Sequence, residues 1–189
     1  MKKPSLRLDI SNLTFPGSLA LVSYNVKRLK PGQTLEVILK GHQLEELKRW
    51  SSESGNLLKV INKNLCRVER GKGFHGVCLN EKLSFYLTGV KLHLKEFLLK
   101  VSNKYPPFLV NFISLREGER ALQLLPKEGF TVLPAPKEIE GYCGFAVGSF
   151  EEKKAKELFF NLLDKKVGVE ALFEKTPKGF KTLLTSWEV

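Results

Sequence analysis

A double proline, Pro106-Pro107, divides the sequence into two blocks that each alternate short apolar segments with amphipathic segments. Proline has no backbone N–H and restricts the residue before it, so this pair ends a helix and suits a boundary between modules. The chain has 189 residues, which is enough for two small modules, and 42% of them are hydrophobic, which is enough to form a core. The sequence therefore predicts an α/β protein of two modules.

The first block, residues 1–71, predicts strands and helices in the order βαβαββ. Residues 6–10 alternate apolar and polar side chains as a half-buried strand does. Apolar residues Leu19, Val22 and Val26 then recur at helical spacing before Pro31-Gly32 ends the helix. The remaining predicted elements are a strand at 34–39, a helix at 43–52 and strands at 57–61 and 66–69.

The second block, residues 105–189, predicts the order βαββαβ. Residues 108–113 form a near-continuous apolar strand, Ser114 caps the helix at 116–125, and Ser149 caps a second helix. The other predicted strands lie at 131–133, 145–147 and 167–173, and the tail at 179–184 pairs with or covers a sheet edge. This order is the ferredoxin-like, or split βαβ, arrangement. Both modules are therefore expected to be α+β two-layer sandwiches.

Residues 72–104 form a connector between the two modules. A strand is expected at 83–87 and an amphipathic helix at 90–101, which ends before the double proline. The predicted division of the chain is therefore 1–71, 72–104 and 105–189.

The positive charge of the chain lies entirely in its first half. Residues 1–104 hold 19 lysine and arginine residues against 8 aspartate and glutamate residues, a net charge of +11, whereas residues 105–189 hold 12 of each. This asymmetry points to an acidic protein partner for the first half or to a basic face that only meets solvent. Nucleic acid comes third, because no segment interleaves aromatic residues with arginine as a base-stacking surface does.

The three cysteines, Cys66, Cys78 and Cys143, are too few for a disulfide framework, and their odd number suggests free thiols. No apolar run approaches the roughly 18 residues of a membrane span. The start, Met1-Lys2-Lys3-Pro4, leads into a charged strand rather than the apolar core of a signal peptide. We therefore expect a cytoplasmic protein that does not enter a membrane.

A metal site is considered at Cys66, His75 and Cys78, because thiolates and imidazole are good zinc ligands. Their spacing fits no standard zinc pattern, and a fourth ligand is not evident. A cysteine on a strand is usually a small core residue. No metal is therefore predicted, and the three residues are kept as weak candidates.

The main candidate for chemistry is Cys143, within Gly141-Tyr142-Cys143-Gly144. Flanking glycines leave a thiol accessible and leave backbone N–H groups free for an anion, which suits a reactive cysteine. The supporting loop also contains Lys137, the one close cation, whereas Glu138 and Glu140 would oppose a thiolate. Alternatively, cysteine occupies this glycine-rich turn only because it is small.

The first module resembles the TusA-type sulfur-carrier family over about residues 5–71. The resemblance rests on Leu8-Asp9-Ile10, on Phe15-Pro16 at the start of a helix, and on the run from Lys30 to Val37. In that family a Cys-Pro-x-Pro turn carries a persulfide at the helix N-terminus. Here Phe15 stands in place of that cysteine, so the resemblance implies the fold and a docking role but not the chemistry.

The second module resembles the small bacterial proteins described as selenium or sulfur carrier-like, over about residues 106–176. The resemblance rests on Leu133-Pro134, on Glu138-Ile139 and above all on the run from Gly141 to Ala146. That family's recurrent thiol lies in a Cys-Gly pair that opens a strand, and Cys143-Gly144 occupies this place.

Together the two resemblances imply a sulfur-handling protein that carries persulfide sulfur on Cys143, as a sulfurtransferase-like carrier if it is active. Its expected partner is a sulfur-donor or sulfur-acceptor protein with an acidic surface. No nucleotide or flavin motif indicates a cofactor. The alternative is a non-catalytic binding or scaffold protein whose basic first half meets an acidic protein or RNA.

Overall fold

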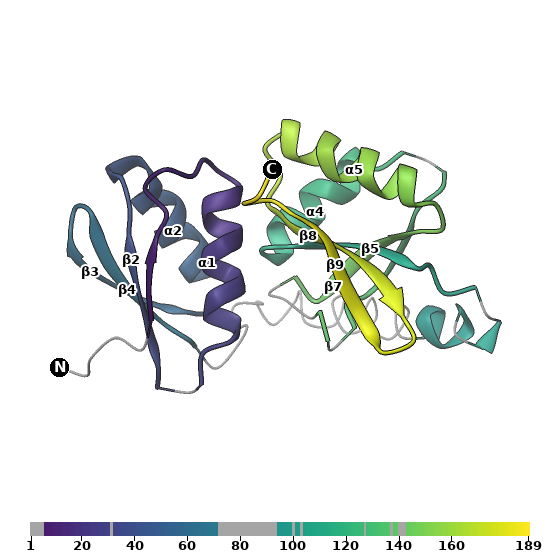
Figure 1. The fold of residues 1–189 in the computed structure, drawn as a ribbon, viewed down its shortest axis with the longest axis horizontal. Helices are drawn as coiled ribbons and strands as arrows, with labels where there is room; N and C mark the ends of the chain where they lie inside the picture. The colour runs from purple at the N-terminus through teal and green to yellow at the C-terminus, as the bar shows by residue number, and fades with distance from the viewer. Residues whose placement is uncertain are drawn as a thin grey trace, which may run out of the picture.

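A computed structural model describes residues 6–30, 32–71, 94–99, 101–102, 104–126, 128–136, 138–139 and 143–189. Two β-sheets, each packed against helices, lie side by side (Figure 1). This arrangement confirms the predicted α+β class. Among the described residues, no helix has the length and apolar character needed to cross a membrane.

The first sheet has the strand order β1-β2-β4-β3, with β1 parallel to β2 and the other neighbours antiparallel. Its elements are β1 (Leu6–Asp9), α1 (Gly17–Lys27), β2 (Thr34–Ile38), α2 (Gly41–Glu53), β3 (Leu57–Asn62) and β4 (Leu65–Glu69). Side chains alternate between the two faces of a strand. Val37 and Cys66 therefore lie in the core with the helices, while Glu36 and Arg67 form an ion pair at 3.2 Å on the opposite face.

The second sheet has the strand order β6-β7-β5-β8-β9, with every neighbouring pair antiparallel. Its elements are β5 (Phe108–Phe112), α4 (Leu115–Leu124), β6 (Thr131–Pro134), β7 (Phe145–Ser149), α5 (Glu152–Asp164), β8 (Val169–Thr176) and β9 (Gly179–Thr185). The predicted tail is thus a strand that pairs with β8.

The two predicted caps of the second block have different outcomes. Ser114 is the N-cap of α4, and its Oγ accepts a hydrogen bond from the Glu117 backbone N–H at 3.4 Å. The prediction for Ser149 is wrong, because this residue ends β7 and Glu151 is the N-cap of α5. The Ser149 hydroxyl instead accepts a hydrogen bond from the Glu151 backbone N–H at 3.2 Å, in the turn between the two elements.

The second sheet buries apolar side chains on both faces. On the helix side, β5 and β7 contribute Val110, Phe112 and Val147 to a core shared with α4 and α5. On the other face, Leu109 and Ala146 pack with Ile139. The connection between β6 and β7 therefore reaches the second face at Ile139 before it returns to the helix side at Cys143.

The two halves share a buried interface, and α1 lies between the two sheets (Figure 1). The Trp50 indole N–H donates a hydrogen bond to the Ile113 carbonyl at 3.0 Å, and Ile113 belongs to the core of the first half. At the C-terminus, the Trp187 ring lies 5.0 Å from the Tyr24 ring on α1. A buried hydrogen bond and a contact between two aromatic rings therefore hold the halves together.

The predicted connector is described only in part. Residues 94–99 are helical, within the helix predicted at 90–101. The strand predicted at 83–87 lies outside the described residues, and the boundaries at 71 and 105 stay predictions.

Candidate functional site

Cys143 lies two residues before the start of β7, and its side chain points into the helix-side core of the second half. The residue is only 4% exposed. Its Sγ packs against Gly118 in the first turns of α4, where an added Cβ would lie 2.4 Å from the sulfur and 2.7 Å from Cζ of Phe145. The thiol therefore occupies a position that only glycine at 118 leaves open.

The surroundings of Cys143 favour the neutral thiol. Burial raises the pKa of Cys143 to about 12, and the carboxylates of Glu119 and Glu170 add to this effect. A hydrogen bond from the Phe145 backbone N–H acts in the opposite direction but is the weaker influence. In this conformation the sulfur is a buried thiol at neutral pH, which differs from the accessible thiolate that the flanking glycines suggest.

Gly144 shows how close the thiol lies to the surface. This glycine is exposed, has a φ of +78°, and has no atom within 4 Å of the position of a Cβ. A residue with a side chain rarely adopts such a φ, so glycine is needed for this turn. The polypeptide meets solvent one residue after Cys143, although the sulfur itself does not.

The predicted supporting residues are only partly described. Glu138 is exposed, and its charge acts on the pKa of Tyr105 rather than on that of Cys143. Lys137, Glu140, Gly141 and Tyr142 lie outside the described residues. The carboxylates that do act on Cys143, Glu119 and Glu170, come from α4 and β8. Sequence analysis missed them because both lie more than twenty positions away from the thiol.

Phe15 and Pro16 lie in the first half, next to the start of α1. Phe15 is partly buried and packs against the first core, and Pro16 is the N-cap residue of the helix. An aromatic ring therefore packs next to the start of α1, at the position where the resemblance to the TusA-type family implies a cysteine. It offers a packing contact and no nucleophile.

Cys66 is the second described cysteine, and it lies in the centre of the first sheet. It belongs to β4, between β2 and β3, and its Sγ lies 3.8 Å from the Val37 carbonyl. Burial raises the pKa of Cys66 to about 12. His75 and Cys78 lie outside the described residues. Within the described part of the chain, no group of three or more His, Cys, Asp or Glu residues could hold a metal ion.

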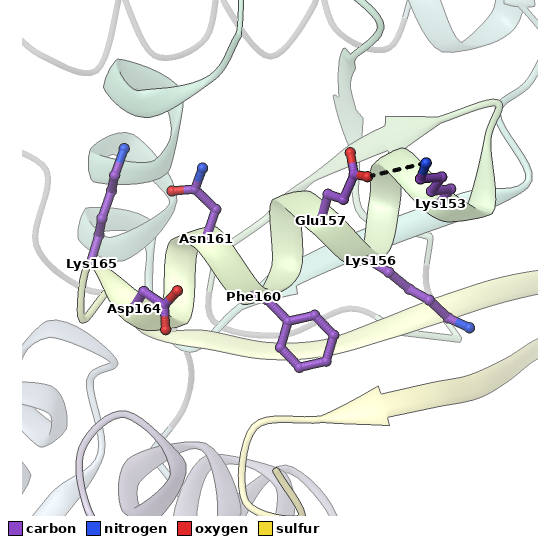
Figure 2. Close-up of a pocket in the computed structure, with 7 residues that line it drawn as sticks. All are labelled: Lys153, Lys156, Glu157, Phe160, Asn161, Asp164 and Lys165. Atoms are coloured by element: carbon purple, nitrogen blue, oxygen red, sulfur yellow. Dashed lines mark ion pairs between the residues drawn. The ribbon is translucent and has the colours of Figure 1, made fainter.

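A surface hollow lies on the outer side of α5 (Figure 2). All of its lining residues come from this helix and from Lys165 directly after it, and Lys153 and Glu157 form an ion pair across one helical turn at 4.0 Å. The inner side of the same helix, with Leu158 and Leu162, packs in the core with Cys143. The hollow is therefore separated from the thiol by the helix itself and is not a candidate site.

One comparison with known proteins is informative about the family. The chain is 31% identical to a protein of Aquifex aeolicus (strain VF5) named "Putative sulfur carrier protein", over 95% of this chain and 96% of the relative. This chain belongs to the same family as that sulfur carrier protein. No family model matches the chain, and no solved structure matches it.

The sulfur-carrier relationship extends over both halves of the molecule. Because the match covers nearly all of each chain, the two halves are joined in the relative as well. The match therefore applies to both halves together rather than to one of them.

Proposed function

We propose that this protein handles sulfur and that Cys143 carries it as a persulfide. The proposal draws on the family membership, which comes from a relative named as a sulfur carrier. The observation that carries the choice of residue is the position of Cys143 beside the solvent-facing Gly144. Cys143 lies outside the strands and beside an exposed residue, whereas exposing Cys66 requires the separation of hydrogen-bonded strands.

Loading the thiol requires a local opening. A persulfide adds a sulfur atom about 2 Å beyond Sγ. The direction of α4 is blocked, because Gly118 and Phe145 already lie in close contact there. Opening also moves the thiol into water, where its pKa returns towards the ordinary value of about 8.5. The buried state then protects the cysteine, and the open state reacts.

The proposed reaction is a thiol–disulfide type of exchange and needs no external oxidant. The Cys143 thiolate attacks the outer sulfur of a donor persulfide, a new S–S bond forms on Cys143, and the S–S bond of the donor breaks. The donor leaves as a thiolate and takes up a proton. Transfer to an acceptor thiol repeats the same step in the opposite direction.

The first half is proposed as the docking unit for the sulfur donor or acceptor. Its positive charge favours a partner with an acidic surface. Its element order β1-α1-β2-α2-β3-β4 is consistent with a TusA-like module, and Phe15 leaves that module without a sulfur-bearing residue. In this proposal the basic half recruits the partner and the second half carries the sulfur.

The experiment is intact-mass spectrometry after incubation with a cysteine desulfurase and cysteine, or with polysulfide. The wild-type protein is expected to gain about 32 Da, the mass of one sulfur atom, and to lose it on reduction. The Cys143→Ser variant is expected to gain nothing, while Cys66→Ser, the matched control, gains the same mass as the wild type. An adduct that persists in Cys143→Ser contradicts the choice of Cys143, and no adduct in the wild type contradicts sulfur carriage.

A second candidate function is a non-catalytic binding or scaffold protein. The observation in its favour is that burial raises the pKa of both described thiols to about 12. Its basic first half would then bind an acidic protein or RNA. Binding without any sulfur adduct supports the scaffold function over sulfur carriage. A salt series tests whether the bound partner is RNA, since binding to RNA falls steeply with salt.

A further inference from the structure

Three side chains form a row along one side of α1, although one of them comes from the far end of the chain. The Trp187 ring lies 5.0 Å from the Tyr24 ring, and the guanidinium carbon of Arg28 lies 3.2 Å from the centre of the same Tyr24 ring. Tyr24 lies on α1 and Arg28 is the C-cap residue of that helix, whereas Trp187 follows β9. Folding therefore assembles a group of aromatic and arginine side chains from both halves.

The end of the chain holds Trp187 in this row. The backbone of Ser186 and Trp187 lies against Gly17 at the start of α1, where an added Cβ would lie 2.4 Å from the Ser186 carbonyl oxygen. Figure 1 shows the C-terminus beside this helix. The Ser186 backbone N–H also donates to the Glu170 carbonyl on β8 at 3.2 Å. The half-buried Trp187 is thus fixed where the two halves meet.

Arg28 is held in place but keeps hydrogen-bonding capacity. The side chain is exposed, and its Nη1 donates to the Tyr24 carbonyl at 2.9 Å. This bond uses one N–H, and a guanidinium carries several more in a planar fork. Glu170 lies near enough to feel the charge of Arg28 but forms its ion pair with Lys27. An arginine that is already ordered loses less conformational entropy when it binds a carboxylate through two parallel hydrogen bonds.

Two further cations, Lys30 and Arg70, lie at the same end of α1, and both are exposed. Arg70 directly follows β4 and donates to the Lys27 and Leu29 carbonyls at 2.7 and 3.0 Å, so its position at the helix end is fixed. A cation at a helix C-terminus stabilises the helix, which accounts for Arg70. It does not account for Arg28, whose guanidinium lies over a ring in the preceding turn.

We propose that the end of α1 and the end of the chain together form a docking surface for the acidic side chains of a partner protein. This junction surface consists of Tyr24, Arg28, Lys30, Arg70 and Trp187. Arg28 binds a carboxylate of the partner, and Lys30 and Arg70 attract the negative charge around it. Tryptophan, tyrosine and arginine are also the residues that are enriched in binding hot spots.

A carboxylate suits this geometry better than a nucleobase. A base binds such a surface by stacking on an aromatic ring. The Tyr24 ring already has Arg28 over it and Trp187 beside it, so a base would have to displace one of them. The junction surface stands on these contacts and charges alone, and its use by the sulfur donor rests on the proposed function.

The first test is binding of the full-length protein to fluorescein-labelled poly-L-glutamate at low salt, measured by fluorescence anisotropy. Arg28→Ala is expected to weaken binding about tenfold. Arg28→Lys keeps the charge but loses the planar fork, so we expect it to lose most of that affinity as well. Lys63→Ala is the matched control, because this exposed lysine lies before β4, at the other end of the strand from Arg70. Its affinity should change by less than about twofold.

Several results would overturn the junction surface. Wild-type affinity in Arg28→Lys would mean that only the positive field of the first half matters. An equal loss in Lys63→Ala and Arg28→Ala would mean that the probe binds without a defined site, and no binding by the wild type would leave the surface without its ligand. Labelled polyuridylate is the parallel probe. Tighter binding of polyuridylate than of poly-L-glutamate, lost in Arg28→Ala, would make the surface a nucleic-acid site.

Trp187→Leu tests the contribution of the second half. The variant keeps every charge of the junction surface but removes the ring that packs against Tyr24. We expect binding of poly-L-glutamate to weaken about threefold. Chemical denaturation shows that the variant is folded under the assay conditions. Wild-type affinity in a folded Trp187→Leu would exclude the second half from the docking surface.

Sulfur loading of Cys143 separates this proposal from the proposed function. Loading by a cysteine desulfurase requires docking, whereas polysulfide is small and does not. In Arg28→Ala we expect the loading rate from the desulfurase to fall about tenfold and the rate from polysulfide to stay unchanged. The predicted losses of poly-L-glutamate binding without any sulfur adduct contradict sulfur carriage alone. Equal desulfurase loading of the variant and the wild type overturns the junction surface as the donor site and leaves carriage on Cys143 standing.

Discussion

The two described cysteines are almost equally buried, but their surroundings differ in what must move to expose them. Cys66 is flanked by β2 and β3, so its exposure breaks the strand pairing of the first sheet. Cys143 lies before β7, next to an exposed glycine, and is covered by Gly118 and Phe145. Burial alone therefore does not separate a structural cysteine from a reactive one, whereas the size of the opening does.

A buried ion pair joins the two halves. The described hydrogen bond of Cys66 lies within the first sheet. Glu170 of the second half pairs with Lys27 of the first half, and Asn111 links Glu170 to the Ile139 carbonyl. The following predictions test this connection and the contrast between the two cysteines.

The largest effect is expected for Lys27→Met. Removing one partner of a buried ion pair leaves a buried charge, so we expect the free energy of unfolding to fall by about 3–5 kcal/mol at neutral pH. Chemical denaturation measures the change. The double variant Lys27→Met/Glu170→Gln is expected to recover much of it, and a single-variant loss below about 1 kcal/mol would mean that the pair does not hold the halves together.

The loss in Lys27→Met should depend on pH. Burial raises the pKa of Glu170 above its ordinary value of 4.5, and Lys27 opposes this shift. A raised pKa in the folded state favours the protonated form of Glu170. The stability that this protonated form contributes is complete below the ordinary pKa and is lost as pH rises through the folded pKa. The variant is therefore expected to lose less stability at about pH 5 than at pH 8, whereas an equal loss at both would contradict a charged Glu170.

A medium effect is expected for Gly118→Ala. The added Cβ would lie 2.4 Å from Sγ of Cys143, so the thiol must move, and we expect a loss of about 1–3 kcal/mol despite the better helix propensity of alanine. Denaturation gives the stability and iodoacetamide the rate. The Cys143 thiol should react faster while Cys66 does not. Equal rates for Cys143 in the variant and the wild type would show that the sulfur is not confined at Gly118.

A smaller effect concerns the pH dependence of Cys143 alkylation in the wild type. If the thiol reacts from an open state, the rate should rise about tenfold per pH unit and level off near the ordinary pKa of about 8.5. If it reacted while buried, the rise would continue towards the raised value of about 12. Peptide-level rates between pH 6 and 10 distinguish the two, and a continued rise through pH 10 contradicts the opening step.

The smallest effect is expected for Arg116→Ala. Its ion pair with Glu53 joins the two halves at 3.1 Å, but the arginine side chain is 57% exposed. Exposed pairs contribute little because water and salt screen them, so the free energy of unfolding should change by less than about 1 kcal/mol. A larger loss would place the main connection between the halves at this surface pair instead of at Lys27 and Glu170.

The sequence predicted most of the fold, because local patterns determine strands and helices. The apolar run at 108–113 and the cap at Ser114 correspond to β5 and α4, and the tail became β9. The error at Ser149 has a local cause as well, since its hydroxyl serves the turn after β7 rather than the first turn of α5. Serine and threonine hydroxyls accept hydrogen bonds both at helix N-caps and in turns, so sequence alone does not distinguish the two roles.

The site was less predictable because its determinants are distant in the sequence. Cys143 was found from its glycine-rich turn, but its burial depends on Gly118, which precedes it by 25 residues. Glu170 fell within the predicted strand at 167–173, yet its partner Lys27 lies 143 positions away. A single acidic residue within an apolar strand is the one local signal for such a buried pair.

The most direct test of the account is to locate the sulfur after loading. The protein is treated with a cysteine desulfurase and cysteine, its persulfides are trapped by alkylation, and the peptides are analysed by mass spectrometry. We predict one additional sulfur on the peptide that contains Cys143 and none on the peptide that contains Cys66. Sulfur on any other cysteine, or on no peptide at all, would contradict the claim that Cys143 is the carrier.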